Sequence, residues 1–270
     1  MPNPQLLAKI ARFRQLHSEG GLLLANAWDL MTARLAEHAG YAAIATTSAG
    51  VSWTLGSRDN QSAPRKLAMQ QATAIASATT LPVSMDLQNG LLEAGETMAD
   101  LVDELIAAGV VGVNIEDANS GTMLSTADAA SRLEQLRAAA DAKGYPLFIN
   151  ARMDAYFRGE CREADGLIAR ARAYVAAGAD GIFIPFLQDL DLCREIADAI
   201  VVPLNVLALP GGPGASQLFA AGVRRLSAGS FLVESAYGQV LDKMRTFRRD
   251  GVLQAEDSHL AYAALDQLLA

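Results

Sequence analysis

An Ala-Gly pair followed at once by a short apolar run recurs along this chain, and this recurrence limits the folds available to it more than any other feature. The pairs are Ala39-Gly40, Ala108-Gly109, Ala177-Gly178 and Ala221-Gly222. Glycine at this place ends a helix in a left-handed conformation and leads into the next strand. The chain is therefore predicted to repeat one unit, in which a helix is followed by a strand.

Short apolar runs alternate with longer amphipathic segments, and eight of these runs are expected to be strands. The expected strands are Leu22–Ala25, Ala42–Thr46, Pro82–Asp86, Gly112–Glu116, Leu147–Ala151, Gly181–Ile184, Leu204–Leu207 and Val223–Ser227. The helices expected between them are Leu30–His38, Arg65–Ala78, Glu96–Ala108, Thr126–Ala142, Arg162–Ala177 and Leu190–Ala199. Strands that are apolar on both faces are typical of parallel sheets covered by helices.

Eight such units predict a closed (β/α)8 barrel, the α/β TIM-barrel fold. An open doubly wound sheet is the alternative, but it usually has fewer strands and a Gly-rich phosphate-binding turn after the first strand. Here the first strand is followed by Asn26-Ala27-Trp28-Asp29, which is not such a turn. We expect a single domain, 1–270, because one barrel typically takes ~250 residues.

Further helices are expected outside the repeat. One is Gln5–His17, and two more lie at about Ser230–Arg248 and Ala255–Ala270. The last two, about 230–270, are expected to pack on the barrel or on a neighbouring subunit.

The composition of the chain argues against some classes of partner and location. A net charge of -8 argues against nucleic acid, which needs a basic surface. No run approaches the roughly 18 apolar residues of a membrane span, and the N-terminal segment lacks the apolar core of a signal peptide. Cys161 and Cys193 are not spaced as metal ligands, so reduced thiols in a cytoplasmic protein are expected.

Reactive groups of such a barrel lie at the carboxyl ends of its strands. Asp86 and Glu116 end two neighbouring apolar strands, where two carboxylates repel each other unless a cation binds between them. Mg²⁺ prefers oxygen ligands and keeps waters that substrate oxygens can displace, and Mn²⁺ is the alternative ion. Each acid could instead cap a helix or pair with an arginine, but for the two together a metal site is favoured.

Two further features of the strand ends point to an anionic ligand. Arg152 can hold a carboxylate with its guanidinium fork, or it can pair with Asp154 or Glu116. The small-residue segment Thr46–Gly50 is expected to be a loop whose backbone N–H groups can bind a carboxylate. Pro210–Gly214 lacks a lysine and Walker spacing, and is expected to be a turn.

Taken together, the strand-end motifs resemble the isocitrate lyase and phosphoenolpyruvate mutase superfamily. They are NAWDLMTARLAEHAGYAAIATTSAG, PVSMDLQNG, VGVNIEDANSG, INARMDAY, ADGIFIPF and PLNVL, in order from about Asn26 to Ser230. The resemblance implies a (β/α)8 barrel, a homo-oligomer (dimer or tetramer) with an exchanged C-terminal helix, and Mg²⁺-dependent chemistry beside an enolisable 2-oxo acid.

The resemblance also implies roles by position. Ser48, with the amides of Ala49 and Gly50, would hold the substrate carboxylate, while Trp28 would pack against the substrate and Asn205 would line the far side.

The remaining positions concern the metal and the reaction. Asp86 and Glu116 would be metal carboxylates, with Asp86 also near the substrate, and Gln88 would act through a water. Asp59 would lie near the metal waters. Arg152 would bind substrate oxygens, so that Arg152, Asp59 and Glu116 form the implied catalytic group.

Three departures from the family pattern bear on the substrate. Gln88 replaces a second acid, so the site is one negative charge poorer. Segment 118–123 lacks the Cys and His of the isocitrate and methylisocitrate lyases, and Phe186 stands where those lyases have Glu. Asn119 and Ser120 are the remnants of the gating loop that the mutases carry. With no His near the strand ends, histidine-dependent decarboxylation of oxaloacetate is not expected.

Three functions therefore stay open. The first is a lyase that acts on a C–C bond of a small 2-oxo or 2-hydroxy acid through an enolate, with pyruvate, oxaloacetate, glyoxylate or a 2-oxoglutarate-like acid as ligand. The second is a C–P bond enzyme, a mutase or hydrolase of phosphoenolpyruvate or phosphonopyruvate, with Arg58 and Arg152 as phosphate-binding candidates. The third is a 2-oxo acid-binding protein with little turnover.

Overall fold

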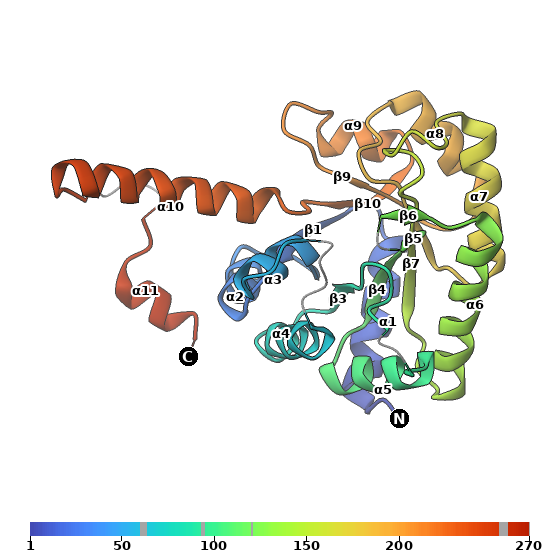
Figure 1. Ribbon diagram of the computed structural model, residues 1–270, viewed down its shortest axis with the longest axis horizontal. Coiled ribbons are helices and arrows are strands. Elements are labelled where there is room, and N and C mark those ends of the chain that lie inside the picture. Colours follow the sequence, from blue (N-terminus) through green and yellow to red (C-terminus); the bar gives the residue numbers. More distant parts are fainter. Residues whose placement is uncertain (60–63, 93–94, 120, 254–258, 270) are drawn as a thin grey trace.

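Eight parallel strands close into a barrel in the order β1-β10-β9-β8-β7-β4-β3-β2, which confirms the predicted (β/α)8 fold. The computed structural model (Figure 1) describes residues 1–59, 64–92, 95–119, 121–253 and 259–269. The barrel strands are β1 (Leu22–Ala27), β2 (Ile44–Thr46), β3 (Val83–Asp86), β4 (Gly112–Glu116), β7 (Phe148–Arg152), β8 (Gly181–Phe183), β9 (Leu204–Leu207) and β10 (Val223–Ser227).

The helices that follow the strands cover the outside of the barrel. They include α2 (Leu30–His38), α4 (Arg65–Ser77), α5 (Met98–Ala108), α6 (Thr126–Ala142), α7 (Ala164–Ala176) and α8 (Leu190–Ala199). All four glycines of the Ala-Gly pairs are left-handed, with φ between 75° at Gly109 and 97° at Gly178, as the sequence predicts.

Two helices and a hairpin were not expected from the sequence. Segment Thr46–Gly50 is not a loop, because α3 (Ser48–Thr54) begins there. Thr47 caps this helix by accepting a hydrogen bond from the backbone N–H of Gly50 at 3.5 Å. The other additions are the short α9 (Ala215–Ala220), after the predicted turn, and an antiparallel pair formed by β5 (Ala118–Asn119) and β6 (Thr122–Met123).

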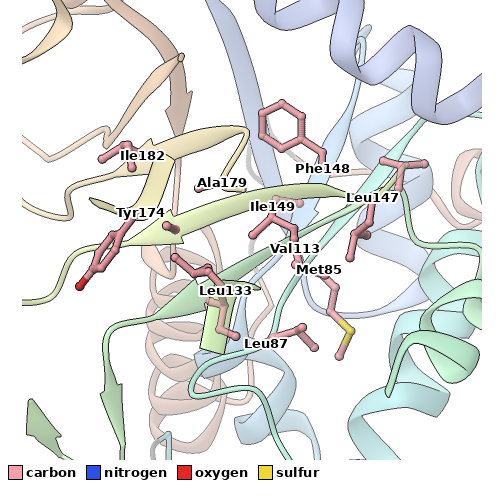
Figure 2. Close-up of a cluster of buried hydrophobic side chains, with 14 of the residues drawn as sticks. Met85, Leu87, Val113, Leu133, Leu147, Phe148, Ile149, Tyr174, Ala179 and Ile182 are labelled. Atoms are coloured by element: carbon pink, nitrogen blue, oxygen red, sulfur yellow. The ribbon is translucent and has the colours of Figure 1, made fainter. Parts of the chain in front are cut away.

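The main core lies between the strands and the outer helices. Figure 2 shows part of it, in which Val113 and Ile149 on neighbouring strands pack with Leu133 of α6 and Tyr174 of α7. These side chains are almost fully buried, and they fix β4 and β7 against the helices. Because Glu116 and Arg152 end these two strands, the core also fixes where the candidate site lies.

The amino end of the barrel is covered by α1 (Pro4–Ser18). Ile10 and Phe13 of this helix are fully buried, and the Phe13 ring packs edge-on against Phe148 with ring centroids 5.3 Å apart. His17 stacks on Phe148 at 4.2 Å. The first predicted extra helix is therefore confirmed, and it closes the floor of the barrel.

The C-terminal helix α10 (Phe231–Asp250) extends away from the barrel, and the shorter α11 (Tyr262–Gln267) is drawn below the middle of α10 (Figure 1). Val233 near the start of α10 is buried. Further along, the helix exposes Tyr237, Val240, Leu241, Met244 and Phe247. The helix expected at Ala255–Ala270 is shorter than predicted, and 254–258 lie outside the described residues. Among the described helices, none is long and apolar enough to cross a membrane.

Candidate active site

Three charged side chains meet at the carboxyl ends of adjacent strands. Asp86 ends β3, Glu116 ends β4 and Arg152 ends β7, and Glu116 and Arg152 stand opposite each other in the parallel register. Arg152 Nη1 lies 2.9 Å from Glu116 Oε1 and 4.0 Å from Asp86 Oδ2. The structure thus brings together the two expected metal carboxylates and the expected substrate arginine.

Asp154 holds the other side of the Arg152 guanidinium. Arg152 Nε donates to Asp154 Oδ1 at 2.7 Å, and Nη2 lies 3.4 Å from Oδ2. The Phe183 ring lies against the same guanidinium, 5.8 Å from its central carbon. Both alternative partners of Arg152, Glu116 and Asp154, are therefore paired with it at once.

Gln88 and Asp59 form a second contact at this edge. Gln88 Nε2 donates to Asp59 Oδ1 at 2.9 Å, so the side chain that replaces an acid of the family pattern binds the expected catalytic aspartate. Gln88 has a φ of 50°, a conformation uncommon outside glycine. Its backbone N–H lies 3.4 Å from Asp86 Oδ1, so the turn after β3 folds back over the Asp86 carboxylate.

Negative charge accumulates around Glu116. Burial raises the pKa of Glu116 to about 8; Arg152 opposes this rise, while Asp154, Asp86 and Asp59 add to it. Burial also raises the pKa of Asp154, against the opposing effect of Arg152. For Arg152 burial lowers the pKa, but Glu116 and Asp154 outweigh it and the net shift is upward. Carboxylates in this cluster therefore exceed the charge that Arg152 supplies.

This charge imbalance fits a hard divalent cation, but only one that keeps most of its waters. Within the described ranges, no three His, Cys, Asp or Glu side chains are arranged to hold a metal ion. Asp86 and Glu116 supply two carboxylates, and the Gln88 amide can accept a metal-bound water. Mg²⁺ is commonly bound through one or two carboxylates with water and substrate completing its six ligands. The donors fit Mg²⁺ on these terms.

The helix after β2 forms the opposite wall of the site. Ser48 lines a small cavity together with Thr46, Val51, Ser52, Met85, Asp86, Gln88 and Leu91. The N–H groups of Ser48 and Ala49 lie in the first turn of α3, where backbone donors are available to an anion. The predicted carboxylate-binding segment thus shares a cavity with Asp86 and Gln88, although it is a helix start and not a loop.

Helix α3 packs closely against Trp28 because residue 50 is a glycine. A Cβ atom there would lie 2.8 Å from Trp28 Cβ and 2.8 Å from Thr47 Cγ2. Trp28 is half-buried behind α3, with its carbonyl accepting a hydrogen bond from Gln71 at 2.9 Å. Its contact with substrate stays a prediction.

Asn205 lies apart from the acidic cluster. It is 1 % exposed inside the barrel, where Oδ1 accepts from Asn150 at 3.0 Å and Nδ2 donates to the carbonyl of Val206 at 2.8 Å. These bonds occupy its amide in the barrel framework, so the structure does not bring it together with Arg152. The expected contact between Asn205 and substrate also stays a prediction.

The chain is similar in sequence and in fold to known proteins of one family. The phosphoenolpyruvate phosphomutase family model matches residues 13–248. An uncharacterised Mycobacterium tuberculosis protein is 36% identical over 219 residues, 81% of each chain. The 2-methylisocitrate lyase of Escherichia coli is 32% identical over 212 residues, which cover 76% of this chain and 70% of that enzyme. A candidate lyase/mutase from Burkholderia cenocepacia superposes with a TM-score of 0.90 at 33% identity, covering 99% of this chain and 98% of that one.

The matched span contains the whole barrel and every candidate residue named above. The expectation that the chain is an enzyme is confirmed by this match and by the characterised lyase among its relatives. The chain belongs to the phosphoenolpyruvate phosphomutase family, within the isocitrate lyase and phosphoenolpyruvate mutase superfamily of enzymes.

Proposed function

We propose that this protein is a Mg²⁺-dependent lyase that breaks or forms a C–C bond next to the carbonyl of a small 2-oxo or 2-hydroxy acid. The observation that carries the proposal is Arg152, held between Glu116 and Asp154 beside Asp86 at the mouth of the barrel. An arginine in this setting can bind the oxygen of an enolate. The similarity to 2-methylisocitrate lyase, a carbon–carbon lyase by name, supports the same class of reaction.

The chain's own residues act on the substrate from two places at the carboxyl ends of the strands. Ser48 and the first N–H groups of α3 bind the substrate carboxylate. From the end of β7, Arg152 donates to the 2-oxo oxygen, which becomes more negative as the bond breaks. Donors already in place where charge develops stabilise that transition state without reorganising. When bound, Mg²⁺ supplies further positive charge toward the same oxygen.

The substrate is expected to be small, in the range of pyruvate, oxaloacetate, glyoxylate and 2-oxoglutarate-like acids. The mouth of the barrel lacks the Cys and the Glu that the resemblance leads one to expect in a lyase. The loop that would carry the Cys is here the β5–β6 hairpin with Asn119, and the Glu is replaced by Phe186, a half-exposed side chain with a φ of 63°. Ser120 lies outside the described residues. The group that protonates the departing carbon is therefore not carried over from the lyases.

The proposal is tested by measuring ligand binding first and product formation second. Isothermal calorimetry of the 2-oxo acids, with and without Mg²⁺, is expected to give binding that requires Mg²⁺ and is lost in Asp86→Ala. Product formation is then followed for the 2-hydroxy acids that would release each ligand. Binding without any product would support a 2-oxo acid-binding protein instead. Failure of every ligand to bind would refute the proposal.

A C–P bond enzyme is the competing assignment, and the same experiment distinguishes it. It predicts turnover of phosphonopyruvate and a large loss in Arg58→Ala, because a phosphoryl group needs a second cation beside Arg152. Arg58 is exposed, whereas Arg152 faces the acidic cluster. Normal phosphonate turnover in Arg58→Ala would remove the phosphate-binding role of that residue.

We further propose that α10 packs against another copy of the chain in a dimer or tetramer. Six large apolar side chains, Leu232 among them, are exposed along this helix, and a stretch of that size on one extended element is typical of a protein–protein contact.

A further inference from the structure

A buried hydrogen-bonded chain leads from α7, on the outside of the barrel, to the candidate substrate arginine. Its centre is Asp117, which follows β4 and is 2 % exposed. Arg170 Nη1 and the Tyr174 hydroxyl each donate to Asp117 Oδ2 at 2.9 Å, and both come from α7. Tyr174 belongs to the cluster of Figure 2, so the donor is itself fixed by the core.

The other Asp117 oxygen faces β7. Asp117 Oδ1 accepts from the backbone N–H of Asp154 at 2.7 Å, and the Asp117 N–H donates to the Arg152 carbonyl at 2.9 Å. Asp117 therefore fixes the backbone on both sides of Met153, at the point where the chain leaves β7. The carboxylate of Asp154, placed in this way, holds Arg152 Nε at 2.7 Å.

This arrangement addresses a physical problem at Arg152. The side chain has several rotatable bonds, and Glu116 and Asp86 attract its charge from one side. A guanidinium that binds substrate must keep one orientation while ligands arrive and leave. Asp154 supplies an anchor on the far side, and Asp117 keeps that anchor from moving. Movement of this anchor would change the direction in which the guanidinium presents its N–H groups.

We propose that Asp117, held by Arg170 and Tyr174, is a positioning residue that orients Arg152 toward a bound 2-oxo acid. The proposal rests on the function proposed above, because it assigns Arg152 to the ligand. Asp117 itself touches no ligand and acts through Asp154. The dependence of Arg152 on Asp117 extends the site to Arg170 and Tyr174 of α7, a helix on the outside of the barrel.

The barrel offers a matched control at the opposite end of the same strand. Asp180 accepts from Arg14 Nη1 at 2.8 Å and from the backbone N–H of Ile149 at 2.9 Å, and Arg137 is its second arginine. Asp180 thus repeats the pattern of Asp117, with a carboxylate that joins side-chain donors to the backbone of β7. It lies near the floor, far along the strand from Arg152.

The experiment compares Asp117→Asn, the milder Tyr174→Phe and the control Asp180→Asn. Oxalate serves as the probe, because it is a stable, planar mimic of a pyruvate enolate. Its affinity is measured by calorimetry in excess Mg²⁺, and thermal unfolding is recorded for every variant. Asp117→Asn is expected to weaken oxalate binding roughly 10- to 100-fold, as loss of a supporting hydrogen bond does at other sites. Tyr174→Phe should weaken it less, and Asp180→Asn should leave it within about twofold while still lowering the unfolding temperature.

A second measurement needs no ligand. The NMR signal of the Arg152 Nε–H group, identified by its loss in Arg152→Lys, is expected to exchange slowly with water in the native protein. The exchange should become much faster in Asp117→Asn and stay slow in Asp180→Asn. If native protein fails to bind oxalate, the proposed function is wrong, and this signal still tests the positioning role. An unchanged Arg152 signal, or an oxalate affinity no weaker in Asp117→Asn than in Asp180→Asn, would overturn the inference.

Discussion

Glu116 Oε1 and Arg152 Nη1 lie 2.9 Å apart, so the acid expected to bind the metal and the arginine expected to bind the substrate are paired with each other. A ligand that recruits either group must compete with this pair. Metal and 2-oxo acid should therefore bind better together than separately, because each releases the partner that the other needs. This exchange makes the protonation of Glu116 the first property to test.

Mg²⁺ affinity is expected to rise with pH through the range around 8. Burial raises the pKa of Glu116 to about 8, so at lower pH the group carries a proton that Mg²⁺ must displace. One displaced proton weakens the apparent affinity about tenfold per pH unit below the pKa. Calorimetry between pH 6.5 and 9.5 measures this slope, and Glu116→Gln should abolish both the slope and most of the affinity.

The same shift has a consequence for stability in metal-free protein. Between the unfolded pKa near 4.5 and the folded pKa of about 8, the native state binds more protons at Glu116 than the unfolded state does. The contribution of this group to the free energy of unfolding is therefore complete below 4.5 and is lost as pH rises to 8. Glu116→Gln should gain stability relative to the native chain as pH rises across this window. Parallel pH profiles of the two proteins would argue against the shift.

Gln88→Glu is expected to make the metal site tighter and the metal-free protein less stable. Gln88 Nε2 donates to Asp59 Oδ1 at 2.9 Å, and a glutamate there would place two carboxylates in that contact. A bound cation would relieve the repulsion. The rise in unfolding temperature on adding Mg²⁺ should therefore be larger in Gln88→Glu than in the native chain. Gln88→Met, which removes the hydrogen bond without adding charge, is the control and should not show the larger rise.

Arg225→Met is expected to stabilise the protein at neutral pH. Arg225 crosses the barrel interior from β10 and is 1 % exposed; its Nη2 donates to Asn114 Oδ1 at 3.1 Å, while Nε and Nη1 have no hydrogen-bond partner within the described part of the chain. Asp86 attracts this charge, but among the described residues no carboxylate forms an ion pair with it. Burying such a charge is costly, and apolar replacements of buried ionic groups can stabilise by about 1–4 kcal/mol.

The pH dependence of the Arg225 effect follows from the same burial, which lowers its pKa to about 9. Above that value the unfolded state binds more protons than the native state, so the native chain regains stability as pH rises. The advantage of Arg225→Met should thus be largest below pH 9 and shrink above it. Chemical denaturation at pH 7 and pH 10 measures both, with Arg225→Lys as the charge-conserving control. A variant less stable than the native chain at pH 7 would show that Asn114 and the Phe13 ring outweigh the cost of burial.

Met244→Glu is expected to lower the oligomeric state. Met244 is 63% exposed on α10, on a helix that extends away from the barrel. If a second chain covers it, a buried glutamate would be strongly unfavourable there. Sedimentation velocity should show smaller species for this variant, with Arg245→Glu as a control for added negative charge on the same helix. Identical sedimentation of Met244→Glu and the native chain would contradict the proposed contact.

The barrel could be predicted from the sequence because its signals are local. Each strand is an apolar run, and glycines such as Gly109 and Gly178 mark where helices end. By contrast, α3 looked like a loop because its residues are mostly small and polar. Its place in the fold depends on the close approach of Gly50 to Trp28, a residue from another segment of the chain. Such contacts leave no periodic pattern.

The candidate site was predictable in part for the same reason. Asp86, Glu116 and Arg152 follow apolar strands, so their place in the barrel follows from the strands. The sequence suggests Asp154 only as a competing partner of Arg152, two residues away, and does not predict that it holds the guanidinium together with Glu116. The contact between Asn114 and Arg225 joins residues 111 positions apart, and no local spacing indicates it.

The packed floor beneath the candidate site closes the amino end of the barrel, so a ligand reaches the site from the carboxyl ends of the strands. Ile10, Phe13 and the stacked rings of His17 and Phe148 fill the amino end of the barrel. If a C–C bond is broken inside, both fragments must leave by the route through which the substrate came. The fragment held by Arg152 is expected to leave after the fragment that Arg152 does not bind. Because substrate and products share one route, the products would be released in a fixed order.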